Sequence, residues 1–137
     1  NKITVSALNG EIATPFFGAS LATDFRFVTE DMEFVLPHTK FGLHPTGGLP
    51  YFLPRYIGHG RAMEYLMTGK KIPAEKALKL SLINAILPQK DFDQQVIKKT
   101  QEISQKDLGS IGISKRLAYF NRDEIINYFD AEMEMFN

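Results

Sequence analysis

The 137-residue chain contains no cysteine. This absence excludes disulfide frameworks, zinc sites built on thiolates, and cysteine nucleophiles. It also fits a reducing compartment, and we expect a cytoplasmic protein. The three histidines and the scattered carboxylates show no HExxH or EF-hand spacing, so we expect no metal site.

The chain also lacks a surplus of either charge and any long apolar run. Lysine and arginine number 16, aspartate and glutamate number 16, and the formal net charge is zero. Without a basic surplus, we expect no nucleic-acid partner. No apolar run approaches the ~18–20 residues of a membrane span, so we expect no membrane partner. Apolar residues make up 44% of the chain, which is enough for a globular core.

Proline and glycine divide the chain into two parts. Residues 1–90 contain all seven prolines and every glycine except Gly109 and Gly112. This part is predicted to form short elements joined by tight turns. Residues 91–137 contain no proline and are predicted to be helical.

Short apolar runs and helix signals alternate through the first part. An apolar run over residues 3–8 predicts a strand ended by an Asn9-Gly10 turn. Thr14, as an N-cap, and Pro15 predict the start of a buried helix over residues 16–23. Further strands are expected over residues 25–28, 33–36 and 83–87, and further helices over 49–56 (with a break or a kink near Pro54), 61–68 and 73–82. Gly69 is expected to end the helix over 61–68. This alternation predicts an α/β fold.

The last predicted helix carries an apolar stripe at helical spacing, formed by Ile125, Phe129, Met133 and Phe136. Two interpretations stay open. The stripe packs on its own domain, as most such helix faces do, or it forms a contact between copies of the chain.

Several ordered motifs in residues 3–88 resemble one known family. They are Ser6-Ala7-Leu8-Asn9-Gly10, Leu21-Ala22-Thr23-Asp24-Phe25-Arg26, Phe41-Gly42-Leu43-His44-Pro45 with Gly47-Gly48, Gly58, the run from Arg61 to Gly69, the run from Ala74 to Leu80, and Leu82-Ile83-Asn84. Together they resemble the crotonase superfamily, the enoyl-CoA hydratase/isomerase family. In the tail, residues 91–137, Ser114-Lys115 is the best match.

The resemblance implies a crotonase-like spiral of strand–helix units over residues 1–90, followed by a C-terminal helical region over 91–137. It implies a lyase or isomerase of fatty acid metabolism whose partner is an acyl-CoA. Coenzyme A is then part of the substrate, and no other cofactor is expected. It also implies a homo-oligomer, a trimer or hexamer. Family members are longer, and this chain has no initiator methionine, so we expect it to be a fragment.

The family stabilises an enolate-like oxyanion with two backbone N–H groups, one of them at the N-terminus of a central helix. In this sequence the N-terminus of that helix matches Thr14-Pro15-Phe16-Phe17-Gly18. The family has a glycine at the position of Pro15, and proline has no N–H to donate. Gly18 and His38 take the places of the two catalytic glutamates, and Thr46 falls near the aspartate of some isomerases.

Several residues are candidates to replace the missing groups. The Phe16 N–H lies one position further on, at the free helix end, and the Thr14 hydroxyl is a second donor. His38 is a candidate base, because an imidazole pKa lies near neutrality. Residues 42–48 form a glycine-rich loop, which by resemblance borders the acyl pocket. The predicted pocket residues are Thr14, Phe16, Phe17, Phe41, His44, Thr46 and Gly47.

Three hypotheses follow from these departures. The chain belongs to an acyl-CoA enzyme that works without the two glutamates. Alternatively, it is a non-catalytic acyl-CoA-binding or subunit protein of the same fold, which Pro15 and Gly18 favour. Thirdly, it is a fragment in which no activity survives.

Overall fold

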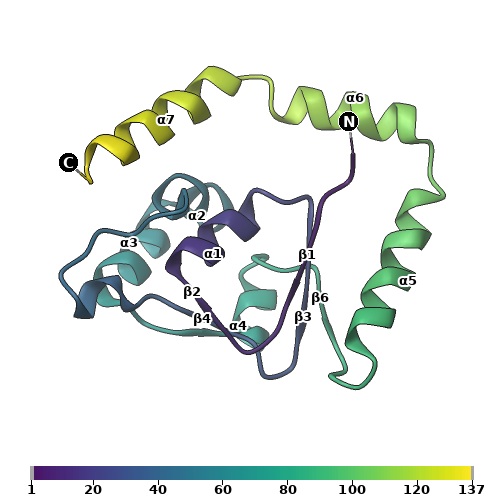
Figure 1. The fold of residues 1–137 in the computed structure, drawn as a ribbon, viewed down its shortest axis with the longest axis horizontal. Coiled ribbons are helices and arrows are strands. Elements are labelled where there is room, and N and C mark those ends of the chain that lie inside the picture. The colour runs from purple at the N-terminus through teal and green to yellow at the C-terminus, as the bar shows by residue number, and fades with distance from the viewer. Residues whose placement is uncertain (1, 137) are drawn as a thin grey trace.

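Strands alternate with helices through the first part of the computed structural model, which describes residues 2–136 (Figure 1). Within these residues, β1, β3 and β6 form one sheet in the order β1-β3-β6, and β2, β4 and β5 form a smaller one in the order β2-β4-β5. The strands are β1 (Val5–Leu8), β2 (Glu11–Ala13), β3 (Phe25–Thr29), β4 (Glu33–Val35), β5 (Ile72–Pro73) and β6 (Ala85–Leu87). The predicted α/β class is confirmed.

Helices connect these strands and then form the whole tail. In the first part they are α1 (Thr14–Leu21), the 3-10 turn η1 (Pro37–Lys40), α2 (Leu49–Ile57), α3 (His59–Thr68) and α4 (Ala74–Lys79). The tail contains α5 (Phe92–Ser104), α6 (Leu108–Ala118) and α7 (Arg122–Glu134). The predicted helical tail and the end of α3 at Gly69, which has a φ of 65°, are confirmed.

The larger sheet is parallel throughout, with β3 between β1 and β6. The strands predicted over residues 3–8 and 83–87 therefore share one sheet, although each pairs with β3 and not with the other. The acidic turn after Thr29 carries the chain from this sheet into the smaller one, where β4 pairs with β2. The two strands on either side of that turn therefore belong to different sheets.

The elements missing from the sequence prediction are the shortest ones. β2, β5 and η1 have only 3, 2 and 4 residues, too few for a hydrophobic period to appear. Of the break or kink predicted near Pro54, the break is wrong, because α2 continues to Ile57 and ends before Gly58. Pro54 has no N–H and leaves one intrahelical hydrogen bond unmade. Leu53, beside Pro54, is fully buried.

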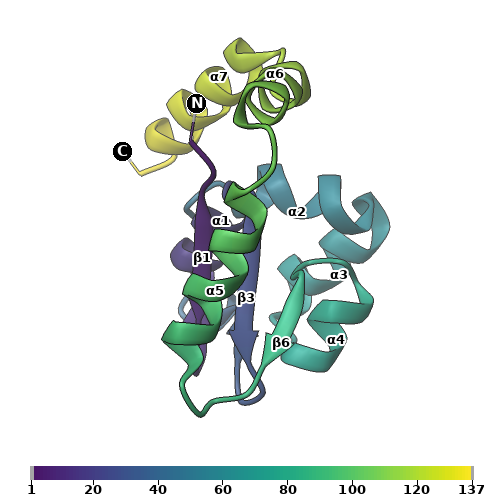
Figure 2. The same cartoon turned by 90° about the vertical axis from the view of Figure 1, so that its right-hand side faces the viewer.

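Two apolar clusters hold the layers together. The main cluster lies among α1, α2, α3 and the sheets and includes Phe17, Leu21 and Phe34, all almost fully buried. The second cluster joins α5 to the larger sheet through Phe27, Leu87, Phe92 and Val96. Figure 2 shows α5 lying along one face of β1 and β3, so the larger sheet is covered by this helix.

The tail wraps around this body as an arc, with α5 on one side, α6 at one end and α7 returning over α2 (Figure 1). Ile125 and Tyr128 on α7 pack against the main cluster. No helix among residues 2–136 has the length and apolar character needed to cross a membrane.

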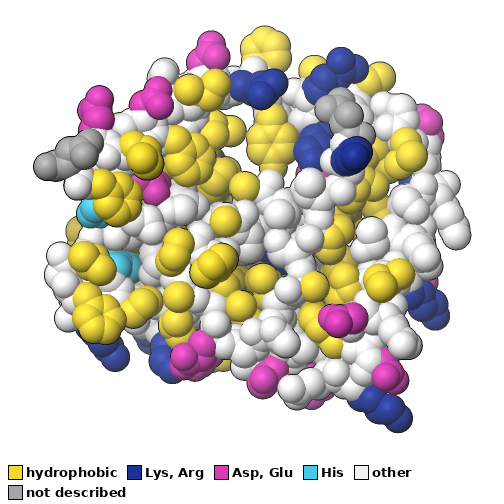
Figure 3. Space-filling model, viewed as in Figure 1, with side chains coloured by type: hydrophobic (Ala, Val, Ile, Leu, Met, Phe, Trp, Pro, Cys, Tyr) yellow, Lys and Arg dark blue, Asp and Glu magenta, His cyan; other side chains and the backbone are white. Residues whose placement is uncertain are grey.

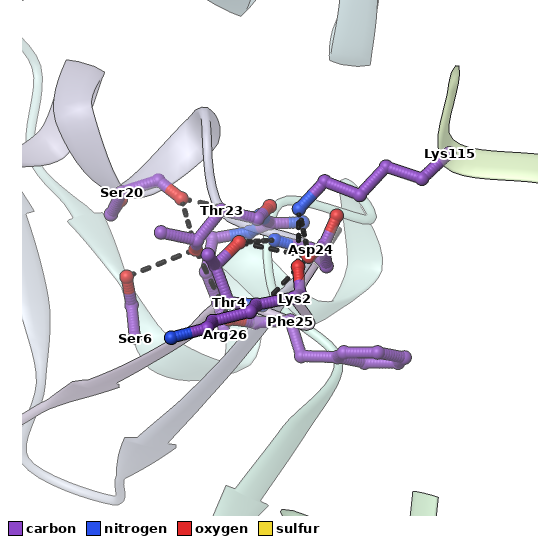
Figure 4. Close-up of polar contacts among 9 residues, drawn as sticks. All are labelled: Lys2, Thr4, Ser6, Ser20, Thr23, Asp24, Phe25, Arg26 and Lys115. Atoms are coloured by element: carbon purple, nitrogen blue, oxygen red, sulfur yellow. Dashed lines mark hydrogen bonds and ion pairs between the residues drawn. The ribbon is translucent and has the colours of Figure 1, made fainter. Parts of the chain in front are cut away.

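A polar cluster fixes α6 to the start of the chain (Figure 4). The Nζ atom of Lys115 donates to the Asp24 Oδ2 atom at 2.7 Å and to the Lys2 carbonyl oxygen at 2.9 Å. The same Oδ2 atom accepts from the Thr4 N–H at 2.7 Å and from the Thr4 hydroxyl at 2.8 Å. Asp24 therefore joins the tail, β1 and the start of β3.

Beside this cluster a buried arginine joins three segments. Arg26 is 4% exposed. Its guanidinium donates to the carbonyl oxygens of Leu82 at 2.7 Å, Thr23 at 2.6 Å and Ser20 at 3.2 Å. These bonds satisfy a charge that would otherwise be costly to bury. They tie the end of α1 to the chain entering β6.

The Asp24 cluster gives a pH-dependent prediction. Burial alone would raise the Asp24 pKa, but the hydrogen bonds from Lys115 and Thr4 outweigh it and hold the pKa below its ordinary value. A lowered carboxyl pKa stabilises the fold above the unfolded-state pKa of about 4, and this contribution is lost as the pH falls through the folded-state value. Asp24→Asn should therefore lower the melting temperature by a few degrees at pH 7.

The difference between the two proteins should shrink as the pH falls below about 4, and thermal melts over a pH series measure it. Asp130→Asn, at an exposed position on α7 away from the helix N-terminus, is the control and should behave like wild type. A difference that stays constant down to low pH would contradict the electrostatic account.

Candidate functional site

Helix α1 begins without a side-chain cap. Its N-cap is Ala13, so the prediction that Thr14 caps the helix is wrong, and Thr14 is instead the first helical residue. Pro15 follows it and has no N–H to donate. The Phe16 N–H is the last one in the first turn without an intrahelical partner. The Phe16 side chain is 71% exposed, so this helix end opens toward the surface.

The Thr14 side chain pairs with His38, which the preceding Pro37 places in η1. The Thr14 Oγ1 and His38 Nδ1 atoms lie 3.2 Å apart, and His38 Nε2 lies 2.9 Å from the Leu66 carbonyl oxygen on α3. Both side chains are buried, Thr14 at 3% and His38 at 6% exposure. The structure thus joins two of the predicted site residues at the start of α1.

The Leu66 carbonyl fixes the direction of these hydrogen bonds. A carbonyl oxygen only accepts, so Nε2 carries the proton, and in the neutral ring Nδ1 is the lone-pair nitrogen. The Thr14 hydroxyl then donates to Nδ1. The lone-pair nitrogen of His38 therefore faces the Thr14 hydroxyl.

The glycine-rich loop lies directly against α1. A methyl group on Gly18 would overlap the Gly47 carbonyl oxygen and lie 2.7 Å from the Leu49 amide nitrogen. A methyl group on Gly47 would overlap the Pro15 carbonyl oxygen and lie 2.8 Å from the Pro15 Cα atom. Gly47 also has a φ of 70°, which favours glycine. Loop backbone therefore fills the space that a side chain at position 18 would need.

A carboxylate from the tail holds this loop. The Glu132 Oε1 atom accepts from the Gly47 N–H at 2.7 Å, and Oε2 accepts from the Gly48 N–H at 3.0 Å. Gly48 is the N-cap of α2 and has a φ of 74°. The carboxylate thus lies at the positive end of α2, where a negative charge is favoured. Glu132 is half-buried.

Sequence reasoning did not find Glu132 or its neighbour Tyr128. Glu132 lies 85 residues from Gly47, in a helix with several other acidic residues. The only available signal was the spacing of four residues, which places Tyr128 and Glu132 on one helix face. Burial raises the Tyr128 pKa, and the hydrogen bond with Glu132 and its negative charge raise it further. This phenol therefore stays protonated at neutral pH.

The predicted aromatic residues are found in two settings. Phe17 is fully buried and stacks on Phe34 with ring centroids 3.8 Å apart, so its ring belongs to the core. Phe41 is 72% exposed beside the loop. The exposed His44 ring meets the Phe136 ring at a centroid distance of 4.5 Å.

A cavity of about 330 Å³ lies between this loop and α7. Its lining includes His44, Pro45, Tyr128 and Glu132. The structure therefore brings the loop residue His44 to the tail, while Thr14 and His38 lie together in the interior on the other side of Pro15 and Gly47. Among residues 2–136, no three histidine or acidic side chains come together as a metal site would need.

The whole chain matches the family described as enoyl-CoA hydratase/isomerase, over residues 1–137. The fold is similar to that of enoyl-CoA hydratase from Bacillus halodurans, with 32% identity and a TM-score of 0.87, covering 97% of this chain and 54% of that one. It is also similar to an Acinetobacter baumannii structure assigned to the enoyl-CoA hydratases/isomerases, with 29% identity, a TM-score of 0.85 and coverage of 95% and 57%.

The enoyl-CoA hydratase of Mycobacterium tuberculosis H37Rv shares the fold at 21% identity, with a TM-score of 0.81 and coverage of 96% and 62%. The chain therefore spans little more than half the length of these relatives. Because the family match covers every residue and the fold is similar to that of the Bacillus halodurans enzyme, the chain belongs to the enoyl-CoA hydratase/isomerase family, with the crotonase fold.

Proposed function

We propose that this protein acts on an acyl-CoA thioester in the cytoplasm, in fatty acid metabolism, by stabilising an enolate-like oxyanion. The observation that carries the proposal is the open N-terminal turn of α1, which lies against the glycine-rich loop and has the Phe16 N–H available. A helix N-terminus adds positive potential where a thioester oxygen gains negative charge. Family membership supports the choice of substrate.

The Phe16 N–H takes the role that Pro15 has lost. Proline at the second helical position removes one donor, and the next N–H along the turn belongs to Phe16. The second oxyanion donor of the family would come from the part of the relatives that this chain does not span. The exposed rings of Phe16 and Phe41 would line the acyl pocket, and His44, Thr46 and Gly47 would border it.

His38 would exchange its proton through Thr14. Its lone-pair nitrogen faces the Thr14 hydroxyl and its other nitrogen is held by the Leu66 carbonyl oxygen. This arrangement orients an acid–base pair at the start of α1. With glycine at position 18, the chain would use this pair in place of the two glutamates.

A second candidate function is acyl-CoA binding without catalysis, or a subunit role in a larger assembly. The surroundings of Gly18 favour this non-catalytic function, because loop backbone occupies the space that a catalytic side chain would need. The burial of the His38 side chain favours the non-catalytic function too. The two functions differ in one outcome, namely product formation.

One experiment separates these functions. The full-length protein is incubated with crotonyl-CoA and a series of other acyl-CoAs, and the products are followed. Cinnamoyl-CoA adds a readout that needs no turnover, because hydrogen bonds to its carbonyl oxygen shift its absorption to longer wavelength. Binding with a shift and turnover supports the enzyme. Binding without turnover supports the second function in its acyl-CoA-binding form. No binding contradicts both acyl-CoA functions and leaves only the subunit role.

Pro15→Gly should return a backbone donor to the helix end. We expect a larger red shift of bound cinnamoyl-CoA and a rise in any turnover of roughly ten-fold or more, because one oxyanion donor contributes at least that much. Pro88→Gly, in the exposed loop after β6, is the control for added backbone freedom and should change neither value. An unchanged shift in Pro15→Gly would contradict the role assigned to this turn.

Gly18→Glu, which restores the family residue, should lower stability and fail to restore hydratase activity. The new side chain would overlap the backbone of Gly47 and Leu49. Even Gly18→Ala should lower the free energy of unfolding by about 1–3 kcal/mol, as measured by urea denaturation. Gly60→Ala in α3 is the matched control, because nothing lies within 4 Å of its added methyl group. Full stability in Gly18→Ala would contradict this packing.

We also propose that the full-length protein is a homo-oligomer, a trimer or hexamer, with the tail in the contact. The predicted stripe is divided in the structure, because Ile125 packs on the main cluster and Met133 is 65% exposed. Other apolar side chains of the tail are exposed, among them Phe120 and Ile126. Figure 3 shows hydrophobic side chains gathered over α7. Such a patch is unusual on a soluble monomer.

Ile126→Asp combined with Met133→Asp should shift the full-length protein to a smaller species in analytical ultracentrifugation. Charges in an apolar contact cost several kcal/mol in total, enough to separate the copies. Met67→Asp, at an exposed position on α3 outside the tail, is the control. An unchanged sedimentation coefficient in the double variant would show that this part of α7 lies outside the contact.

A further inference from the structure

Glu132 stands out because a carboxylate from the far end of the chain binds two consecutive loop N–H groups. Its three hydrogen bonds to Gly47 and Gly48 range from 2.7 to 3.4 Å. Apart from these bonds, α7 is held by the surface ion pair between Glu124 and Arg55 on α2 and by partly buried apolar side chains, Ile125 and Tyr128; none of its residues is fully buried. The carboxylate is therefore a principal anchor between the tail helix and the loop.

The loop that Glu132 holds lies in turn against α1. Gly47 is so close to Pro15 and Gly18 that neither glycine has room for a methyl group. A shift of the Gly47 peptide would therefore push on the first turn of α1 or leave a gap beside it, because packed backbone does not deform freely. The position of that turn depends on where the loop is held.

We propose that Glu132 is a positioning residue of the acyl-CoA site: through Gly47 and Gly48 it holds the first turn of α1, with the Phe16 N–H, in place for the thioester oxygen. This inference rests on the function proposed above. It adds that α7 is required for oxyanion stabilisation as well as for covering apolar surface. Glu132 itself need not touch the acyl group.

The geometry of the Gly47 and Gly48 N–H groups explains why a glutamate is found at position 132. The two N–H groups converge because Gly47 and Gly48 both have φ values near 70°, which side-chain-bearing residues rarely adopt. Such a pair of N–H groups at a helix N-terminus favours a negatively charged acceptor. A charged acceptor binds more strongly than a neutral one. Glutamine at this position keeps one acceptor oxygen and loses the charge.

The experiment compares Glu132→Ala and Glu132→Gln with wild type in the full-length protein, using cinnamoyl-CoA and free coenzyme A as probes. We expect the red shift of bound cinnamoyl-CoA to fall to less than half of the wild-type value in Glu132→Ala and to an intermediate value in Glu132→Gln. The Kd for free coenzyme A should change less than two-fold. Glu134→Ala, an exposed residue on the same helix, is the control and should retain the full shift.

Amide hydrogen exchange provides a readout that is independent of the substrate. Gly47 and Gly48 should exchange faster by ten-fold or more in Glu132→Ala, while β1 and β3 stay protected if the variant is folded. Glu132→Gln serves in the same way if the alanine variant does not fold. Faster exchange together with a reduced red shift supports the proposal.

The outcomes separate this inference from the proposed function. A full red shift in the variants overturns the positioning role of Glu132 and leaves acyl-CoA binding intact. Unchanged exchange at Gly47 and Gly48 overturns it as well. If wild type itself gives no shift with cinnamoyl-CoA, the proposed function fails and the inference fails with it.

Discussion

The close approach between Gly47 and the first turn of α1 is the constraint on which the rest of the site depends. Two backbone segments touch here without side chains between them, so Gly18 and Gly47 both have to be glycine. The contact closes the space beside Gly18 and leaves the Phe16 end of the helix exposed. Under the proposed function, chemistry at this helix end would rely on backbone N–H groups and on the buried Thr14.

Charged side chains connect the tail to this core at three places. At the surface, Glu124 at the start of α7 pairs with Arg55 on α2. At two less exposed places, Lys115 on α6 binds Asp24 beside β1, and Glu132 on α7 binds the loop that packs on α1. In both places a formal charge meets several partners with limited access to water, where such bonds are stronger than at an open surface. The tail helices bury few apolar side chains, so these polar anchors define how α6 and α7 lie on the core.

Buried polar groups near the site all have partners, and this limits what they can do. Among the described residues, no buried side-chain nitrogen or oxygen lacks a hydrogen bond. The Arg26 guanidinium donates to backbone carbonyl oxygens. Both ring nitrogens of His38 are hydrogen-bonded, one to the Thr14 hydroxyl and the other to the Leu66 carbonyl oxygen. His38 is therefore a structural link between η1, the start of α1 and α3.

Local sequence signals determined most elements of this protein: the apolar runs gave β1 and β3, Gly69 ended α3, and the absence of proline after residue 90 allowed three tail helices. They also located the start of α1 to within one residue. Only the tertiary structure decided which groups meet there. The Thr14–His38 pair spans 24 residues and the Glu132–Gly47 contact spans 85, and no local pattern encodes such distances. These contacts follow from how the sheets and the returning tail pack, because packing brings together residues that have no regular spacing along the chain.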